Sequence, residues 1–92
     1  WKGVILDDEN KYQIWIPAGF AHGFLTLSNI AVLDYKVTNY WCSESEKTLS
    51  WNDKEISINW PFKDLNLKAP IMSDKDRHGL SINELALNNY LF

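Results

Sequence analysis

Residues 15 to 24, "WIPAGFAHGF", place His22 in an otherwise apolar run that is interrupted by a proline and two glycines. Pro17 cannot donate to a strand ladder and so ends one strand, and the glycines allow a tight turn before the next. A histidine that opens this next strand would point into the mouth of a barrel, where an imidazole can bind a ligand, a metal ion or a proton. The same residues also fit a hydrogen-bonded core histidine beside a turn.

A tyrosine and a tryptophan lie in a later apolar segment, "IAVLDYKVTNYW". Leu33, Tyr35 and Val37 share one face of its alternation, which is typical of a half-buried strand. A phenol on that face is either a core residue with a satisfied hydroxyl or a proton donor. Tyr40 and Trp41 end the segment, where exposed rings could stack on a nucleobase or a sugar, or could close the end of a β-sandwich.

Three charged residues complete the set of side chains that could do chemistry. Glu46 and Lys75, taken alone, are ordinary solvated charges. Asp76 lies in the polar cluster "SDKD" and could orient a histidine that acts as a general base. It could also cap a helical turn.

The elements that must position these residues are short and alternating. Strand-like alternation recurs in "YQIWIP", "GFLTLSN", "IAVLDYKVTNYW" and "EISINW", with the turn-like stretches "SESEK" and "WNDKE" between the later segments. In the second of these turns, Asn52 and Asp53 can bond their own backbone. The pattern predicts an all-β, antiparallel sandwich or barrel.

The pattern changes after Pro61. Residues 62–79 show no sustained period, and connections of that length are often functional. Ser81 and Glu84 then stand at capping-box spacing before an apolar stripe, which predicts one short C-terminal helix. The stripe consists of Ile82, Leu85, Ala86 and Tyr90.

Composition narrows the classes of function. The 92 residues fit one domain, 1–92, with 46% hydrophobic residues and five tryptophans. The net charge of -3 without a basic run argues against nucleic-acid binding, and no segment approaches the ~20 apolar residues that span a membrane. The single Cys42 fits a reducing, cytoplasmic compartment. Because Trp1 begins a strand-like segment, we expect the chain to be the C-terminal part of a longer protein.

Two resemblances add to this reading. Pro17, Gly19 and His22 resemble the second motif of the cupin superfamily, whose histidine often joins others around a metal ion. His78 is the only other histidine, so the usual metal site cannot be built from this chain alone. The ordered strings "ENKYQIWIPAGFAHGFLTLS", "YKVTNYW", "WND", "INWP" and "SDKD" resemble the C-terminal half of the dTDP-4-dehydrorhamnose 3,5-epimerase family.

The family resemblance implies a partial cupin-type jelly roll and an activity. The activity is epimerisation at C3 and C5 of dTDP-4-keto-6-deoxy-D-glucose to dTDP-4-keto-L-rhamnose, by proton abstraction next to the ketone. It implies no metal or organic cofactor, a dTDP-sugar as binding partner and a homodimer. Tyr35 matches the proton donor, and Asp76 matches the carboxylate that pairs with the catalytic histidine. The substrate-binding positions it implies are His22, Trp41, Glu46 and Lys75, with Phe20 and Phe24 as apolar walls.

The family's N-terminal half is missing from these 92 residues, and this limits the activity expected of them. The base histidine, a lysine near the keto oxygen and the arginines for the diphosphate belong to the N-terminal half, so the 92 residues alone are predicted to be inactive. The absent strands would also leave sheet edges open to association. A C3-only or C5-only epimerase, a non-catalytic sugar-nucleotide-binding cupin and a metal-dependent cupin enzyme are the alternatives.

Overall fold

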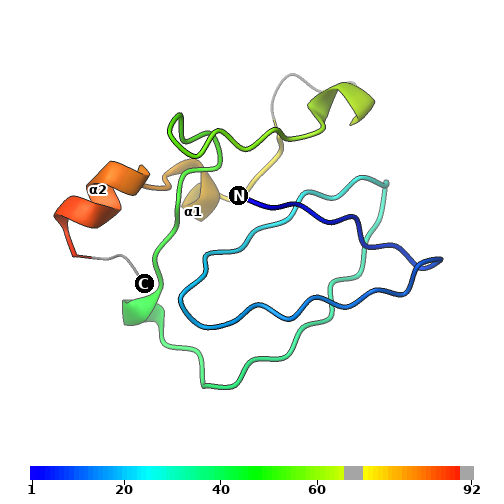
Figure 1. The fold of residues 1–92 in the computed structure, drawn as a ribbon, viewed down its shortest axis with the longest axis horizontal. Coiled ribbons are helices and arrows are strands. Elements are labelled where there is room, and N and C mark those ends of the chain that lie inside the picture. The colour runs from blue at the N-terminus through cyan, green and yellow to red at the C-terminus, as the bar shows by residue number, and fades with distance from the viewer. Residues whose placement is uncertain (66–69, 90–92) are drawn as a thin grey trace.

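A computed structural model describes residues 1–65 and 70–89 of the chain. Its helical elements in chain order are η1 (Ser43–Ser45), η2 (Phe62–Leu65), α1 (Asp74–Arg77) and α2 (Ile82–Leu87) (Figure 1). No ladder of β-strands is assigned within the two described ranges, and the pairing there is an isolated parallel bridge between Leu49 and Leu80. The jelly roll therefore remains a prediction for this chain.

The first 42 residues run as long extended segments that reverse direction at 8–10, 18–19, 28–29 and 38–39 (Figure 1). Two of these reversals have a local cause, a side-chain hydrogen-bonded turn at Asp7 and a positive φ at Gly19. Asp7 Oδ1 accepts hydrogen bonds from the amides of Glu9 at 3.0 Å and Asn10 at 2.6 Å. Gly19 has φ +93°, a left-handed conformation that glycine adopts without strain. The reversal after Pro17 thus lies where the sequence predicts a turn.

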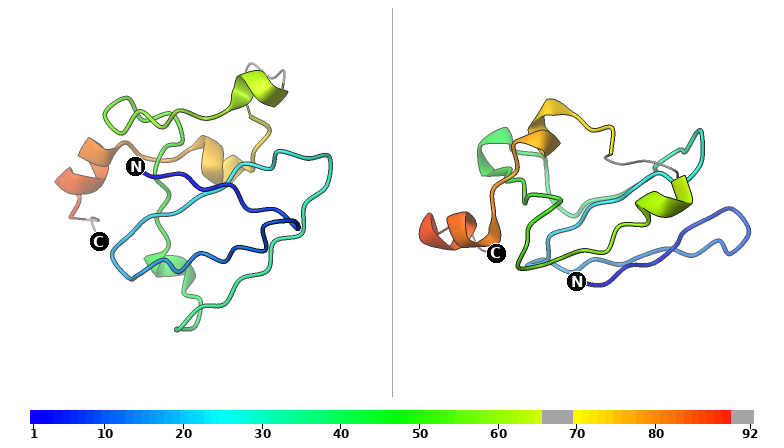
Figure 2. Two further views of the ribbon diagram at one scale, coloured as in Figure 1. Left: turned by 45° about the vertical axis from the view of Figure 1, so that its right-hand side comes forward. Right: turned by 90° about the horizontal axis from the view of Figure 1, so that it is seen from above.

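The helices lie beside this layer of extended segments (Figure 2). α2 carries Leu85, which is 1% exposed and is the buried apolar side chain of the described residues. Its predicted capping box is confirmed: Ser81 Oγ accepts the Glu84 amide at 3.1 Å, and Glu84 Oε2 accepts the Ser81 amide at 2.8 Å. Both bonds satisfy amides that would otherwise lack partners at the helix start. Tyr90 of the predicted stripe lies outside the described residues.

Asp53 ties the turn at 53–56 to α2. Its Oδ1 accepts the amides of Glu55 at 2.9 Å and Ile56 at 3.0 Å, which confirms the predicted backbone-bonding turn. Its Oδ2 accepts the amide of Ile82, 29 residues away, at 2.7 Å. The carboxylate is 8% exposed, and these bonds compensate for its burial. Asn52 instead accepts the Ser50 hydroxyl at 2.7 Å.

The bridge between Leu49 and Leu80 brings two backbones unusually close. The Leu80 amide donates to Thr48 O at 2.8 Å, and the Ser50 amide donates to Leu80 O at 2.7 Å. A Cβ on Gly79 would lie 2.8 Å from Ser50 Cα and from Ser50 N. Residue 79 is therefore best occupied by glycine, which has no Cβ to meet the backbone at Ser50.

Aromatic residues extend the packed part toward η2. The rings of Trp51 and Phe62 meet edge to face, with centroids 5.6 Å apart and an interplanar angle of 73°. Trp60 Nε1 donates to Trp51 O at 2.8 Å. Edge-to-face geometry is a favourable arrangement for aromatic pairs, so these rings hold residues 51–62 together.

The chain exposes more surface to solvent than a compact protein of the same mass would. Its accessible surface is 8885 Å², whereas a compact monomer of 10.7 kDa exposes roughly 5500 Å². Its radius of gyration is 14.4 Å, against roughly 12 Å for a compact domain of this length. The additional surface is largely the extended part, where Trp15 is 79% exposed.

Candidate functional site

The carboxylate of Glu46 joins two other predicted binding residues. Its Oε1 accepts a hydrogen bond and ion pair from Lys75 Nζ at 2.5 Å. Its Oε2 accepts a hydrogen bond from the indole Nε1 of Trp41 at 3.4 Å. The structure thus brings together Trp41, Glu46 and Lys75, here called the Glu46 cluster, from segments 29 residues apart.

The short helix η1 places Glu46 back over Trp41. The Ser45 amide donates to Cys42 O at 3.1 Å, and the Glu46 amide donates to Ser43 O at 3.3 Å. These bonds close a single turn of 3₁₀ helix between the tryptophan and the carboxylate. The sequence "CSES" therefore forms the local turn that allows side chains five positions apart to meet.

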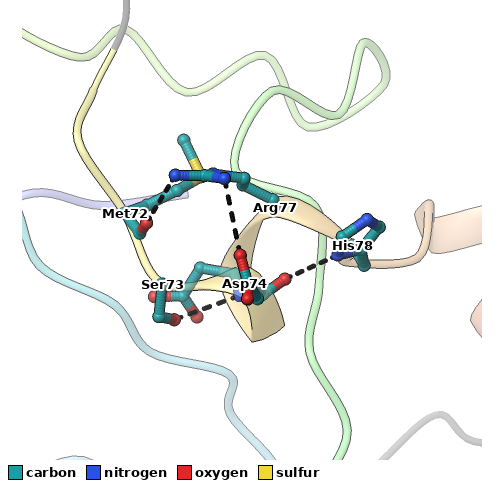
Figure 3. Close-up of polar contacts among 6 residues, drawn as sticks. Met72, Ser73, Asp74, Arg77 and His78 are labelled. Carbon is teal, nitrogen blue, oxygen red and sulfur yellow. Dashed lines mark hydrogen bonds and ion pairs between the residues drawn. The ribbon is translucent and has the colours of Figure 1, made fainter.

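The other side of the Glu46 cluster is α1, a single helical turn fixed by polar contacts (Figure 3). Ser73 Oγ accepts the Asp76 amide at 3.3 Å and caps the turn. Arg77 donates to Asp74 Oδ1 and to Met72 O, each at 3.4 Å. His78 Nδ1 lies 2.7 Å from Asp74 O. These contacts hold the backbone that carries Lys75.

Electrostatics keep the Glu46 cluster charged near neutral pH. The hydrogen bond from Lys75, and then that from Trp41, lower the pKa of Glu46 below its ordinary 4.5, against a small opposing effect of burial. The hydrogen bond and charge of Glu46 raise the pKa of Lys75 above 10.5, again against burial. The charges of Asp76 and Tyr35 add to this rise, so both residues lie within electrostatic range of Lys75.

The predicted catalytic side chains are exposed. Tyr35 is 73% exposed on the segment at 31–37. Asp76 is also exposed, and its amide bonds to Ser73 while its carboxylate contacts no histidine in the described ranges. The cap of this turn is Ser73, so the alternative in which Asp76 caps it is wrong. Ser73 can cap because its hydroxyl stands at the position before the first helical residue.

The remaining predicted site residues stand apart from the Glu46 cluster. His22 is exposed, and no hydrogen bond to it occurs in the part of the chain that the structure describes. Phe20 and Phe24 are 67% and 65% exposed. In this structure the three side chains do not enclose a pocket with Trp41 and Lys75, and their predicted roles stay predictions.

A polar hollow lies elsewhere, between the turn at 50–55 and the start of α2. The side chains of Asp53, Glu55 and Glu84 line it, and all three already bind chain donors. We assign it a structural role because these acceptors are engaged in holding α2. Among the described residues, no group of three or more His, Cys, Asp or Glu side chains could hold a metal ion.

Cys42 lies between Trp41 and η1 and is an exposed free thiol. The hydroxyl of Ser45, 3.5 Å from Cys42 Sγ, lowers the pKa of the thiol, and the amides of Ser45 and Glu44 act in the same direction.

None of the helices in the described part of the chain has the length and apolar character needed to cross a membrane.

Two of these features go beyond the sequence predictions. Glu46, Lys75 and Trp41 are predicted as separate substrate contacts, whereas the structure joins them through one carboxylate. The turn at Asp53 is predicted, but the bond to Ile82 is not. Neither long-range contact has a local signal, although the five-residue spacing of Trp41 and Glu46 around "CSES" is compatible with a tight turn.

Comparison with known proteins shows the family to which this chain belongs. The sequence matches a family of dTDP-sugar isomerases, described as dTDP-4-dehydrorhamnose 3,5-epimerase, over residues 1–84. The chain belongs to the dTDP-4-dehydrorhamnose 3,5-epimerase family, as the ordered strings of the sequence indicate. No solved structure matches the chain at a significant level.

Curated relatives carry the same name across bacteria. The protein of Pseudomonas aeruginosa is 52% identical over 79 residues, which are 86% of this chain and 41% of that protein. The Escherichia coli K12 protein is 48% identical over 85 residues, covering 92% of this chain and 44% of that protein. A Mycobacterium tuberculosis protein is 30% identical over 91 residues, covering 99% and 44%. The chain thus spans about two fifths of the length of these relatives.

Proposed function

We propose that this chain supplies the C-terminal part of a site that epimerises C3 and C5 of dTDP-4-keto-6-deoxy-D-glucose, giving dTDP-4-keto-L-rhamnose. The observation that carries the proposal is the Glu46 cluster. It places an aromatic ring, a carboxylate and an ammonium group side by side, with Tyr35 and Asp76 in electrostatic range of the ammonium. Membership of the epimerase family supports the same assignment.

The proposed reaction moves one proton at each carbon. A base removes the proton next to the ketone, and the electron pair of that C–H bond moves to form an enolate with negative charge on the keto oxygen. The phenol of Tyr35 then gives its proton to the same carbon from the opposite face, the C–H bond forms and the ketone returns. The tyrosinate then takes up a proton from solvent, and the base releases the proton that it removed to solvent. The base itself is expected in the portion of the relatives that this chain does not match.

The binding groups have separate parts in this proposal. The 76% exposed ring of Trp41 offers a face on which the thymine can stack. Lys75 and Glu46 offer a donor and an acceptor for the nucleotide, and Asp76 orients the base histidine. His22, Phe20 and Phe24 line the sugar pocket once neighbouring strands enclose the segment that carries them.

The same proposal covers the fold and the assembly. We propose that the extended segments of residues 1–42 are strands of a cupin-type jelly roll and that the complete protein is a cytoplasmic homodimer. The alternation of apolar residues and the exposed surface of 8885 Å² support it, because alternating strands need sheet partners to bury one face. The lone thiol of Cys42 supports a reducing compartment.

A non-catalytic sugar-nucleotide-binding protein is the second candidate. One observation favours it: the binding residues of the Glu46 cluster are already joined, whereas His22 is not joined to them. Such a protein would retain affinity for the nucleotide and lack proton exchange.

Proton exchange in heavy water tests these alternatives. The protein used is a hybrid in which the portion of the Pseudomonas aeruginosa relative that this chain does not match precedes this chain. Loss of both the C3 and C5 proton signals of dTDP-4-keto-6-deoxyglucose supports the 3,5-epimerase, and loss of one identifies a single-carbon epimerase. Retention of both signals by a folded hybrid that binds dTDP overturns the catalytic proposal in favour of the binding protein.

A further inference from the structure

The start of α2 is completed by a carboxylate from another part of the chain. The capping box satisfies the amides of Ser81 and Glu84, whereas the amide of Ile82, the first helical residue, lies outside it. Asp53 Oδ2 accepts this amide at 2.7 Å across 29 residues. An amide at that position has no partner within its own helix, so the bond fixes the start of α2 to the turn at Asp53.

The bond to Ile82 is separate from the bonds that form the turn. Asp53 Oδ1 alone accepts the two amides that close the turn, those of Glu55 and Ile56. The carboxylate is 8% exposed, and a buried oxygen that loses its donor is costly. One oxygen of Asp53 therefore shapes the turn, and the other holds α2.

Two backbone bonds hold the residue just before α2 on the same segment. The Leu80 amide donates to Thr48 O at 2.8 Å, and the Ser50 amide donates to Leu80 O at 2.7 Å. Together with the bond to the Asp53 carboxylate, they attach the stretch between the helices α1 and α2 to residues 48–53 (Figure 1). These three hydrogen bonds are here called the anchor.

The turn of α1 ends just before the anchor. One residue separates the C-cap of α1, His78, from Leu80. The ion pair of Lys75 with Glu46 also links α1 to another segment, but these side chains are 57% and 36% exposed, and exposed pairs contribute little. The anchor is therefore the stronger constraint on the place of α1, which carries Asp76.

We propose that Asp53 is a positioning residue, which holds the Ile82 amide and thereby fixes the place from which α1 presents Asp76. The inference rests on the proposed function, in which Asp76 orients the base histidine. Catalysis is sensitive to such placement, because a displacement of about 1 Å can lower a rate by about 100-fold. A weaker anchor should therefore slow proton transfer, although Asp53 itself does not touch the substrate.

The substitution Ile82→Pro removes the bond to Asp53 and leaves the rest of α2 in place. Proline has no amide N–H, and the first position of a helix accepts it well. Ser81 already has the extended backbone, with φ −69° and ψ 161°, that a residue before proline requires. The turn bonds of Asp53 Oδ1 do not involve residue 82.

The first test compares the kinetics of two variants of the hybrid. Ile82→Pro should lower kcat by about three- to tenfold and leave KM within about twofold, because the loss affects the orientation of a catalytic group. Ile82→Ala is the matched control, since it keeps the amide and shortens the side chain further than proline does. Its kcat should stay within about twofold of the wild type. Equal kcat values for the two variants would overturn the proposal.

A double-mutant cycle shows whether the effect passes through Asp76. In the Asp76→Asn background, Ile82→Pro should lower kcat by less than about twofold, because the orienting carboxylate is already lost. A merely structural role would reduce the folded fraction and lower the rate by the same factor in both backgrounds, which would overturn the proposal. If the Ile82→Pro hybrid does not fold, Asp53→Asn replaces it in the cycle, with an expected loss of about two- to fivefold that is absent in the Asp76→Asn background.

Nitrogen-15 NMR of the 92-residue chain separates this inference from the proposed function. The amide resonances of Asp76 and Arg77 should shift in Ile82→Pro and stay in place in Ile82→Ala, with no nucleotide added. Unchanged resonances of α1 in Ile82→Pro would overturn the positioning role. If they shift while the unaltered hybrid exchanges no proton of dTDP-4-keto-6-deoxyglucose, the proposed function fails and the anchoring of α1 stands.

Discussion

Residues 1–42 expose most of their large apolar side chains, whereas the described residues of the second region, 43–65 and 70–89, pack several of theirs. The exposed large apolar side chains of the described chain lie in the first region, apart from Ile71 and Leu87. The second region holds the buried Leu85, the ring contact of Trp51 with Phe62 and the bonds of Asp53. Both regions contain apolar residues at regular intervals, in the alternating segments of the first and in "EISINW" and the stripe of α2 in the second, although residues 62–79 show no sustained period.

The contrast between the two regions shows which structures a short chain can form by itself. A capped helical turn or an Asx turn needs partners within a few residues, and α1, α2 and the turn at Asp53 all satisfy their amides in this way. An alternating strand needs a neighbouring strand for its backbone and a second layer for its apolar face. The second region therefore packs, while the first is extended and exposed.

The rest of the protein should strongly protect the amides of residues 1–42 from exchange with solvent. In the hybrid with the Pseudomonas aeruginosa portion, the amides of residues 11–37 should exchange with deuterium at least about tenfold more slowly than in the 92-residue chain, because strand pairing protects them. The amides of α2 should change less. Hydrogen exchange with mass spectrometry measures both regions at once, and equal protection of residues 11–37 in the two proteins would contradict the proposal that these residues form strands of a sheet.

Truncation of the buried leucine should separate the two regions by stability. Leu85→Ala should cost about 2–5 kcal/mol of unfolding free energy, since it removes a side chain that is 1% exposed. Leu33→Ala, at 55% exposure in the first region, should cost much less in the 92-residue chain. Chemical denaturation followed by tryptophan fluorescence compares them. Similar costs for the two variants would mean that the first region is packed in solution.

The two regions also differ at their glycines. Gly79→Ala should lower the unfolding free energy by about 1–3 kcal/mol, because the added methyl would meet Ser50 backbone atoms at 2.8 Å. Gly23→Ala is the matched control, since a Cβ there meets no atom within 4 Å. Thermal unfolding by circular dichroism gives both values. A Gly79→Ala variant as stable as Gly23→Ala would show that residues 49–50 and 79–80 do not cross closely.

The sequence carries the local features of this fold and few of the distant ones. The capping box of Ser81 and Glu84 and the turn at Asp53 follow from side chains that reach amides two or three residues away. The bond from Lys75 to Glu46 and the bond from Ile82 to Asp53 each join residues 29 positions apart, and no local periodicity encodes them. The roles predicted for Tyr35 and His22 rest on the family strings, because an isolated tyrosine or histidine has several ordinary uses.

A smaller effect is expected on the stability of the chain in acid, through the hydrogen bonds of the Asp53 carboxylate. The amides of Ile56 and Ile82 lower the pKa of the Asp53 carboxyl below its ordinary 3.8, burial opposes them, and the amide of Glu55 adds to the lowering. The unfolded chain therefore binds a proton at higher pH than the native chain does. The contribution of Asp53 is complete above pH 3.8 and is lost as the pH falls from there through the lowered native value.

Asp53→Asn should reveal this contribution as a difference between two pH profiles. The variant should melt several degrees below the wild type at pH 7, because an amide accepts fewer and weaker hydrogen bonds from the three amides. The two melting temperatures should converge as the pH falls below 3.8, where the wild-type carboxylate becomes protonated. Asp34→Asn is the control from the first region and should melt with the wild type at pH 7. A constant gap between Asp53→Asn and wild type down to pH 2 would mean that the carboxylate charge does not hold the turn to α2.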